Sequence, residues 1–293
     1  MGIRIEVAQP GDVSVLRAVN IEPSEPAAGQ VWVEHDAIGV NFLDVTQRNG
    51  AVPLSMPGGI GVEAAGRVAR VGPGVTHVKT GDRVGYVLGA PGSYATGRMY
   101  PAQRLIKLPD SLASVDAASV LMKGITAHYM LTTTYAVGSE TIAVIYGAAG
   151  ALGQIMVPWA RALGATVIGV VSRESSVARA LKSGCNAVLV WGKDDIPAEV
   201  ARLTAGRKAH VVYDGVGKAT FEASLDSLGT RGLLVSIGAS SGAPPAVAVS
   251  ALNSKGSLYL TRPSLAAHAT DIEEYRRRAD AVFEAIAAGI IRP

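Results

Sequence analysis

Residues 141–153 read TIAVIYGAAGALG, an apolar run that leads into a turn with three glycines. Residues 141–146 predict a buried strand, and residues 151–163 predict a helix. A glycine turn between a strand and a helix exposes unpaired N–H groups and the positive end of the helix dipole. The small residues Ala149 and Gly150 would let the backbone approach a pyrophosphate, and Gly153 would let helix and sheet pack closely. This stretch therefore predicts a dinucleotide site.

Downstream of this turn, apolar runs and helical patterns alternate regularly. We expect strands at 165–171, 187–191, 209–213, 233–237 and 257–261, and helices at 176–183, 197–204, 219–228 and 271–288. Strands without alternating polarity, interleaved with helices, are typical of a parallel sheet covered on both faces. The second half of the chain is thus predicted to be a doubly wound α/β domain.

The first 110 residues have a different pattern. Short β-rich runs at 3–7, 30–40, 65–71 and 83–88 are separated by proline and glycine turn signals. This spacing predicts a small β-barrel. Residues 115–131 are mostly apolar or small and predict one or two helices.

Composition limits the classes of protein that remain. A length of 293 residues corresponds to about two domains. With 48% hydrophobic and 17% charged residues and a net charge of +3, the chain is not typical of a disordered protein. The single cysteine, Cys185, excludes an internal disulfide and a site with several cysteine ligands.

The first residues lack the apolar core of a signal peptide, and the uncharged stretches 141–160 and 232–254 are interrupted by glycine and proline. We expect a cytoplasmic protein that does not enter the membrane.

The second strand of the α/β region indicates which dinucleotide is bound. It is followed by Ser172 and Arg173, a hydroxyl and a guanidinium that suit a 2′-phosphate. Glu174 is evidence against this interpretation, because a carboxylate turned inward would favour NAD. The alternative is that Arg173 and Glu174 are both solvated loop charges. We expect NADPH.

Three other kinds of site lack support. The five histidines lie far apart in the sequence, so zinc is not expected. Residues 238–242 match a G-x-S-x-G nucleophile motif, but no acidic residue lies between Ser240 and His268, the last histidine. Nucleic acid is not an expected partner, because residues 276–278 are the only basic run and aromatic residues make up 5%.

Seven motifs carry a resemblance to a known family. They are GVNFLD (39–44), GVEAAGRVARVGPGV (61–75), KTGDRV (79–84), KGITAHYML (123–131), YGAAGALG (146–153), VVYDGVG (211–217) and NSKGSLYLTRPSL (253–265). The chain resembles the zinc-free quinone oxidoreductases, the ζ-crystallin-like group of the medium-chain dehydrogenase/reductase superfamily. The resemblance implies a GroES-like β-barrel catalytic domain at 1–120, a Rossmann NADPH-binding domain at 121–263 and a cleft between them. The catalytic domain would be completed by 264–293, and it looks truncated, because relatives continue through a further strand, helix and strand.

The resemblance also implies roles for particular residues. Asn41 and Thr126 match residues that approach the nicotinamide, and Thr46 stands where relatives have a substrate-pocket tyrosine, so Asn41 and Thr46 are the expected catalytic residues. The expected cofactor contacts are Ala151, Leu152 and Gly153 at the pyrophosphate, Val216, Ile237 and Ser240 along the cofactor, and Trp191 in place of a tyrosine near the 2′-phosphate. Ser176 replaces a lysine that commonly meets this phosphate, and Arg173 is expected to compensate. Zinc-dependent relatives have a histidine where this chain has Val62 and a cysteine near Asn41.

The expected activity is hydride transfer from NADPH to a quinone without a metal, since quinones accept reducing equivalents without a strong Lewis acid. Two alternatives remain open: reduction of an enone or alkenal double bond, and a non-catalytic NADPH-binding protein of the crystallin or RNA-binding type. The apolar strand at 257–261 could pair with its counterpart in a second chain, so we expect a homodimer.

Overall fold

The computed structural model describes residues 2–293, which divide into two compact units. Unit 1 comprises the chain up to Met122, residues 271–279 and Pro293; unit 2 comprises residues 123–270 and 280–292. Two helices, α2 (Ser114–Tyr129) and α9 (Ile272–Ala287), contribute residues to both units. The domain limits at 120 and 263 stay a prediction.

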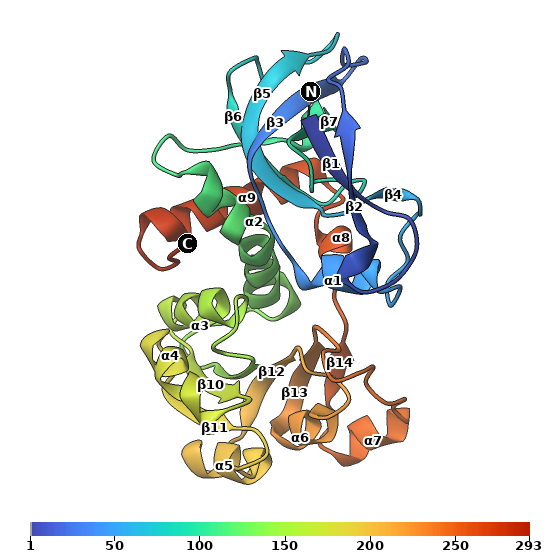
Figure 1. Cartoon of the computed structure of the whole chain (residues 1–293). Coiled ribbons are helices and arrows are strands. Elements are labelled where there is room, and N and C mark those ends of the chain that lie inside the picture. Colours follow the sequence, from blue (N-terminus) through green and yellow to red (C-terminus); the bar gives the residue numbers. More distant parts are fainter. Residues whose placement is uncertain (1) are drawn as a thin grey trace. The chain divides into compact units, whose positions relative to one another are not determined.

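Unit 1 consists mainly of antiparallel strands (Figure 1). The strands are β1 (Gly2–Val7), β2 (Leu16–Ile21), β3 (Gln30–Ile38), β4 (Gly58–Gly59), β5 (Glu63–Val71), β6 (Arg83–Val87), β7 (Gly97–Pro101) and β8 (Ile106–Lys107). They form one sheet in the order β2-β1-β4 and another in the order β7-β3-β5-β6-β8. The core of the larger sheet includes Val31, Val33 and the fully buried rings of Tyr86 and Tyr100. The short helix α1 (Phe42–Arg48) follows β3.

Unit 2 is built on one parallel sheet of six strands. The strands are β9 (Ile142–Tyr146), β10 (Thr166–Val171), β11 (Ala187–Val190), β12 (Ala209–Asp214), β13 (Leu228–Ser236) and β14 (Tyr259–Thr261). Their order is β11-β10-β9-β12-β13-β14, so the direction of winding reverses between β9 and β12. The doubly wound sheet predicted from the alternating pattern is therefore confirmed.

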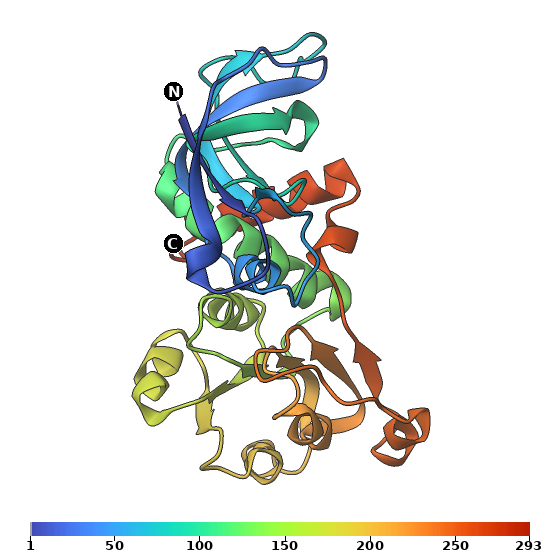
Figure 2. The same ribbon diagram turned by 45° about the vertical axis from the view of Figure 1, so that its right-hand side comes forward.

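Helices cover both faces of this sheet. They are α3 (Gly153–Ala162), α4 (Val177–Lys182), α5 (Ile196–Leu203) and α6 (Phe221–Asp226). Two short helices, α7 (Val249–Ser254) and α8 (Leu265–His268), follow β13 and β14 in the chain. Right-handed crossovers place α3 and α4 on one face and α5 and α6 on the other (Figure 2). The core between these layers includes Val144, Val170 and Val212, all at most 1% exposed.

The structure differs from the sequence expectations mainly in short elements. Helix α1 was not expected, and it is stabilised by the Asp44 carboxylate, which accepts the Asn41 N–H at its first turn. Helix α3 begins at Gly153 instead of residue 151, because residues 151–152 still belong to the turn. Strand β13 begins at Leu228, five residues earlier than expected. Within residues 2–293, no helix is both long and apolar enough to cross a membrane.

Candidate functional site

A cavity of about 250 Å³ lies where the chain leaves the ends of β9, β12 and β13. It is lined by Ile145, Tyr146, Gly147, Gly150, Ala151, Leu152, Gly153, Met156, Gly215, Val216, Ile237 and Ser240. The cavity sits at the carboxyl edge of the sheet, beside the point where the winding direction reverses, which is where open α/β sheets bind their ligands. Seven residues predicted to contact the cofactor line this one cavity: Gly150, Ala151, Leu152, Gly153, Val216, Ile237 and Ser240.

The turn between β9 and α3 presents free N–H groups to this cavity. Gly147 has φ +67°, and Gly147 donates its own N–H to the Val170 carbonyl at 2.9 Å. By contrast, the backbone N–H groups of Ala151, Leu152 and Gly153 have no acceptor among the described residues. Because these three residues line the cavity at the start of a helix, their N–H groups suit an anionic pyrophosphate.

Close packing around Gly153 fixes the shape of the turn. A Cβ at Gly153 would lie 2.4 Å from the Gly147 carbonyl oxygen and 2.7 Å from the Ala148 backbone. A Cβ at Gly150 would lie 3.1 Å from the same oxygen. Ala149 is 8% exposed and does not line the cavity, and its contact with the cofactor stays a prediction. The glycine at 153 is therefore required by the backbone itself.

The opposite wall of the cavity is held by Asp214, at the end of β12. Its carboxylate is 2% exposed and accepts the N–H groups of Val216 (2.8 Å) and Gly217 (3.0 Å). It also accepts the hydroxyls of Thr220 and Ser224, each at 2.7 Å. Four donors satisfy this buried carboxylate, and together they fix the loop that carries Val216 into the cavity wall.

Tyr146 is the last residue of β9 and also lines the cavity. The ring is 6% exposed, and burial raises the pKa of its hydroxyl to about 12. The hydroxyl is buried and has no partner within residues 2–293. Trp191 packs against this ring edge to face, with ring centroids 6.4 Å apart.

Ser172 and Arg173 follow β10 and are exposed, outside the lining of the 250 Å³ cavity. Glu174, the residue that would favour NAD, forms an ion pair with Lys193. Its carboxylate is therefore engaged by a lysine. This arrangement leaves Arg173 as a cation for the expected 2′-phosphate, and the roles of Ser172, Arg173 and Trp191 stay predictions.

In unit 1, Asn41 is part of a buried polar network. Its side-chain amide donates to Glu63 at 2.7 Å, and the other oxygen of Glu63 accepts the Met122 N–H at 2.7 Å. Asp44 accepts the Asn41 N–H at 2.9 Å and the Tyr94 hydroxyl at 3.0 Å. Asp44 is thus a structural anchor of the loop.

The other two residues expected near the reaction lie on helices. Thr46 is half-buried on α1 and donates its hydroxyl to the Leu43 carbonyl at 2.8 Å. Thr126 is half-buried on α2 and belongs to unit 2. The contacts of Asn41, Thr46 and Thr126 with a cofactor or substrate stay predictions.

Sequence reasoning missed three residues that shape these sites: Glu63, Tyr146 and Asp214. Glu63 is the first residue of β5, and its carboxyl group is fully buried. Its hydrogen-bond partners, Asn41 and Met122, lie 22 and 59 residues away in the sequence. Asp214 gave a usable signal, since it is the one charged residue at the end of an apolar strand, directly before a Gly-Val-Gly turn.

The side chains at the zinc-ligand positions of related proteins do not suit a metal. Val62 is apolar and 3% exposed, and the amide of Asn41 is engaged by Glu63. Across residues 2–293, no three His, Cys, Asp or Glu side chains are grouped as metal ligands.

Comparison with known proteins gives a consistent result along the whole chain. Residues 27–110 match the alcohol dehydrogenase GroES-like domain, and residues 151–284 match the family described as zinc-binding dehydrogenase. Quinone oxidoreductase 1 of Escherichia coli (strain K12) is 42% identical over 293 residues, which is 100% of this chain and 90% of that protein. A 2-haloacrylate reductase from a Burkholderia species is 41% identical over 279 residues, 92% of this chain and 84% of that protein.

Solved structures of similar proteins share the fold over nearly their full length. A Pseudomonas syringae quinone oxidoreductase has a TM-score of 0.96 and 40% identity, covering 100% of this chain and 90% of that one. The Escherichia coli quinone oxidoreductase complexed with NADPH has a TM-score of 0.95 and 42% identity, and the match covers 99% of this chain and 89% of that one. The expected α/β class, with a GroES-like part and a Rossmann-like sheet, is confirmed.

Proposed function

The chain belongs to the quinone oxidoreductase family of the medium-chain dehydrogenase/reductase superfamily, and on this premise we propose the roles of its residues in NADPH-dependent quinone reduction. The single observation that carries the cofactor assignment is the row of free N–H groups at Ala151, Leu152 and Gly153, which line a cavity at the switch point of the sheet. Bound NADPH supplies the hydride.

The residues of this chain bind and orient the reactants. The N–H groups at the start of α3 hold the pyrophosphate, Val216, Ile237 and Ser240 line the path of the cofactor, and Arg173 meets the 2′-phosphate. Asn41 contributes a rigid amide, held by Glu63, for the nicotinamide ribose or the acceptor. Thr46 forms part of the acceptor's pocket. Positioning by such groups is the protein's main contribution to the rate.

We expect rapid, quinone-dependent oxidation of NADPH by the full chain. The test compares the initial rates of NADPH and NADH oxidation with 1,4-benzoquinone, with an alkenal and with 2-chloroacrylate. The highest kcat/KM with benzoquinone and NADPH supports the proposal. NADPH binding without oxidation in the presence of any acceptor contradicts it and favours a non-catalytic binding protein.

Reduction of an activated double bond is the second candidate. It is favoured by the 2-haloacrylate reductase that is 41% identical to this chain. The same panel separates the two activities, because a kcat/KM higher for 2-chloroacrylate or the alkenal than for benzoquinone would replace the first proposal with this one.

Arg173→Ala should weaken the binding of NADPH but not of NADH. A charge-assisted contact with the 2′-phosphate is lost, so we expect the Kd for NADPH to rise about ten-fold or more. Titration of the protein with each nucleotide measures both constants. The control is Arg207→Ala, which removes an exposed arginine in the loop before β12. An unchanged Kd for NADPH in Arg173→Ala contradicts the assigned role.

We further propose that the chain forms a homodimer through β14. This strand is the edge of the sheet in unit 2, and its Tyr259 and Leu260 side chains are 59% and 37% exposed. An unpaired, apolar edge strand is a ready partner for its counterpart in a second copy.

Within a cell we place this dimer in the cytoplasm, where a single buried cysteine such as Cys185 stays reduced.

Leu260→Asp should convert the dimer to a monomer, because it places a carboxylate in the proposed interface. Sedimentation at micromolar concentration should show a dimer for the wild type and a monomer for this variant. Leu181→Asp, at a 48% exposed leucine on α4, is the control and should remain dimeric. A monomeric wild-type chain would overturn the proposed assembly.

A further inference from the structure

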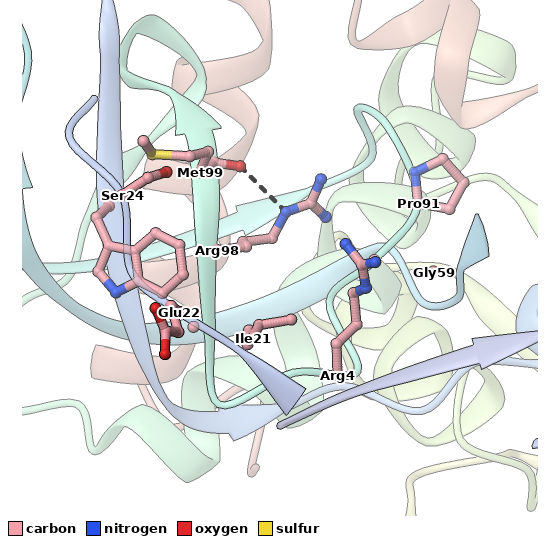
Figure 3. A pocket seen from close by; sticks show the side chains of 11 residues that line it. Arg4, Ile21, Glu22, Ser24, Gly59, Pro91, Arg98 and Met99 are labelled. Carbon is pink, nitrogen blue, oxygen red and sulfur yellow. Dashed lines mark hydrogen bonds between the residues drawn. The ribbon is translucent and has the colours of Figure 1, made fainter. Parts of the chain in front are cut away.

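Unit 1 contains a cavity of about 310 Å³ whose lining includes none of the residues assigned to NADPH or to the reaction. Arg4 and Glu22 contribute from β1 and the end of β2, and Trp32 and Arg98 contribute from the paired strands β3 and β7. Figure 3 shows the guanidinium groups of Arg4 and Arg98 pointing toward the same space, with Pro91 beside them. The Glu22 carboxylate lies away from these two groups in this view.

Three nitrogen atoms of this lining are buried without a hydrogen-bond partner in the described part of the chain. They are Nε of Arg4, Nε1 of Trp32 and Nη1 of Arg98. Trp32 is only 6% exposed, so its indole N–H has no ready access to bulk water. Buried donors in folded proteins are nearly always satisfied, and the unsatisfied nitrogens of Arg4 and Arg98, whose guanidinium groups point toward one space, indicate an acceptor between them.

The charges around the cavity indicate the sign of that acceptor. Arg98 forms no ion pair within residues 2–293; its guanidinium lies over the rings of Tyr100 and Tyr86, 5.4 and 5.9 Å from their centroids. Its Nε donates to the Met99 carbonyl at 3.3 Å. Arg4 is paired with Glu6 through Nη2. With two guanidinium groups and Glu22 in the lining, an anion of low charge fits best.

Two glycines keep the space beside the guanidinium groups open. A Cβ at Gly92, which has φ +131°, would lie 3.5 Å from Nη1 of Arg98. A Cβ at Gly59 would lie 2.8 Å from the Gly92 Cα and 3.5 Å from Cδ of Arg4. The backbone at Gly59 and Gly92 therefore forms this wall of the cavity, and neither residue places a side chain beside the two guanidinium groups.

We propose that this cavity binds a small organic monocarboxylate. Its carboxylate lies between Arg4 and Arg98, because guanidinium groups offer planar pairs of N–H donors that match a carboxylate. Its apolar body lies against the other walls, which include Ile21, Trp32 and Met99. A phosphate dianion fits less well, since the carboxylates of Glu22 and Glu6 together carry as much negative charge as Arg4 and Arg98 carry positive charge.

The test uses benzoate as the probe and the indole N–H signals of the full chain in ¹H–¹⁵N NMR. The chain has three tryptophans, and Trp32→Phe identifies the signal of Trp32. Benzoate at millimolar concentration should shift the Trp32 signal in a saturable way, and benzamide, which is neutral, should not. Both Arg98→Met and Arg4→Gln should raise the Kd for benzoate about ten-fold or more.

The control is Arg70→Gln, which removes a half-exposed arginine of the same unit that pairs with Glu25, outside the cavity. It should bind benzoate like the wild type. Arg4→Gln changes a half-exposed side chain, so it remains informative if Arg98→Met does not fold. No saturable shift, or an unchanged Kd in the folded variants of Arg4 and Arg98, would overturn the proposal. Tighter binding of inorganic phosphate than of benzoate would also overturn it.

Discussion

Gly153→Ala is expected to raise the Kd for NADPH by at least about 100-fold, because two or more hydrogen bonds to a charged pyrophosphate are lost. The added Cβ would lie 2.4 Å from the Gly147 carbonyl oxygen and 2.7 Å from Cα of Ala148. Both contacts are with backbone, so no side chain can rotate away, and the turn itself must shift. The three free N–H groups at the start of α3 then lose their common direction. Titration with NADPH measures the effect.

Two further glycines make this a graded series. A Cβ at Gly150 meets the same carbonyl oxygen at 3.1 Å, so Gly150→Ala should have an intermediate effect on the Kd. Gly138 has open space around its Cβ position, and Gly138→Ala should bind NADPH like the wild type. Measuring the melting temperature of each variant separates loss of binding from loss of folding. If folded Gly153→Ala binds NADPH as tightly as Gly138→Ala does, the pyrophosphate is held elsewhere.

Much of the cavity at the ends of β9, β12 and β13 could be predicted from the sequence, because its signals are local. The apolar run of β9, the glycine turn and the start of α3 are contiguous, and each depends on neighbours within a few residues. The other walls, at Val216 and Ile237, also follow apolar strands, and strand ends of a parallel sheet meet at one edge. Because the strands are parallel, residues predicted separately at the end of each strand lie together around one cavity.

The polar groups of unit 1 could not be predicted in this way. Antiparallel strands bring distant residues together through register, as Trp32 pairs with Met99 in β3 and β7. Strands β4 and β8 have only two residues each, too few for any periodic pattern. The contact of Glu63 with Asn41 depends on the close approach of Gly39, where a Cβ would lie 2.2 Å from the Glu63 carboxylate. Such contacts follow from packing, which no local pattern reports.

Asp214→Ala is expected to lower the free energy of unfolding by at least about 3 kcal/mol, since each buried donor left without its acceptor costs about 1–3 kcal/mol. The carboxylate satisfies two backbone N–H groups and the hydroxyls of Thr220 and Ser224. The hydroxyls can rotate toward other acceptors, but the N–H groups of Val216 and Gly217 cannot. The loop that carries Val216 should therefore move, and NADPH binding should weaken as well.

Asp214→Asn should lie between Asp214→Ala and the wild type. The asparagine oxygen can still accept the two backbone N–H groups, and the hydroxyls of Thr220 and Ser224 can turn to accept from its amide. Asp195→Ala, which removes an exposed N-cap of α5 whose carboxylate accepts the Ala198 N–H at 3.2 Å, is the control and should cost about 1 kcal/mol. Urea unfolding curves measure all three variants. If Asp214→Ala and Asp195→Ala lower the free energy of unfolding equally, Asp214 contributes no more than an ordinary helix cap. A larger loss for Asp214→Ala supports its role in holding the cavity wall.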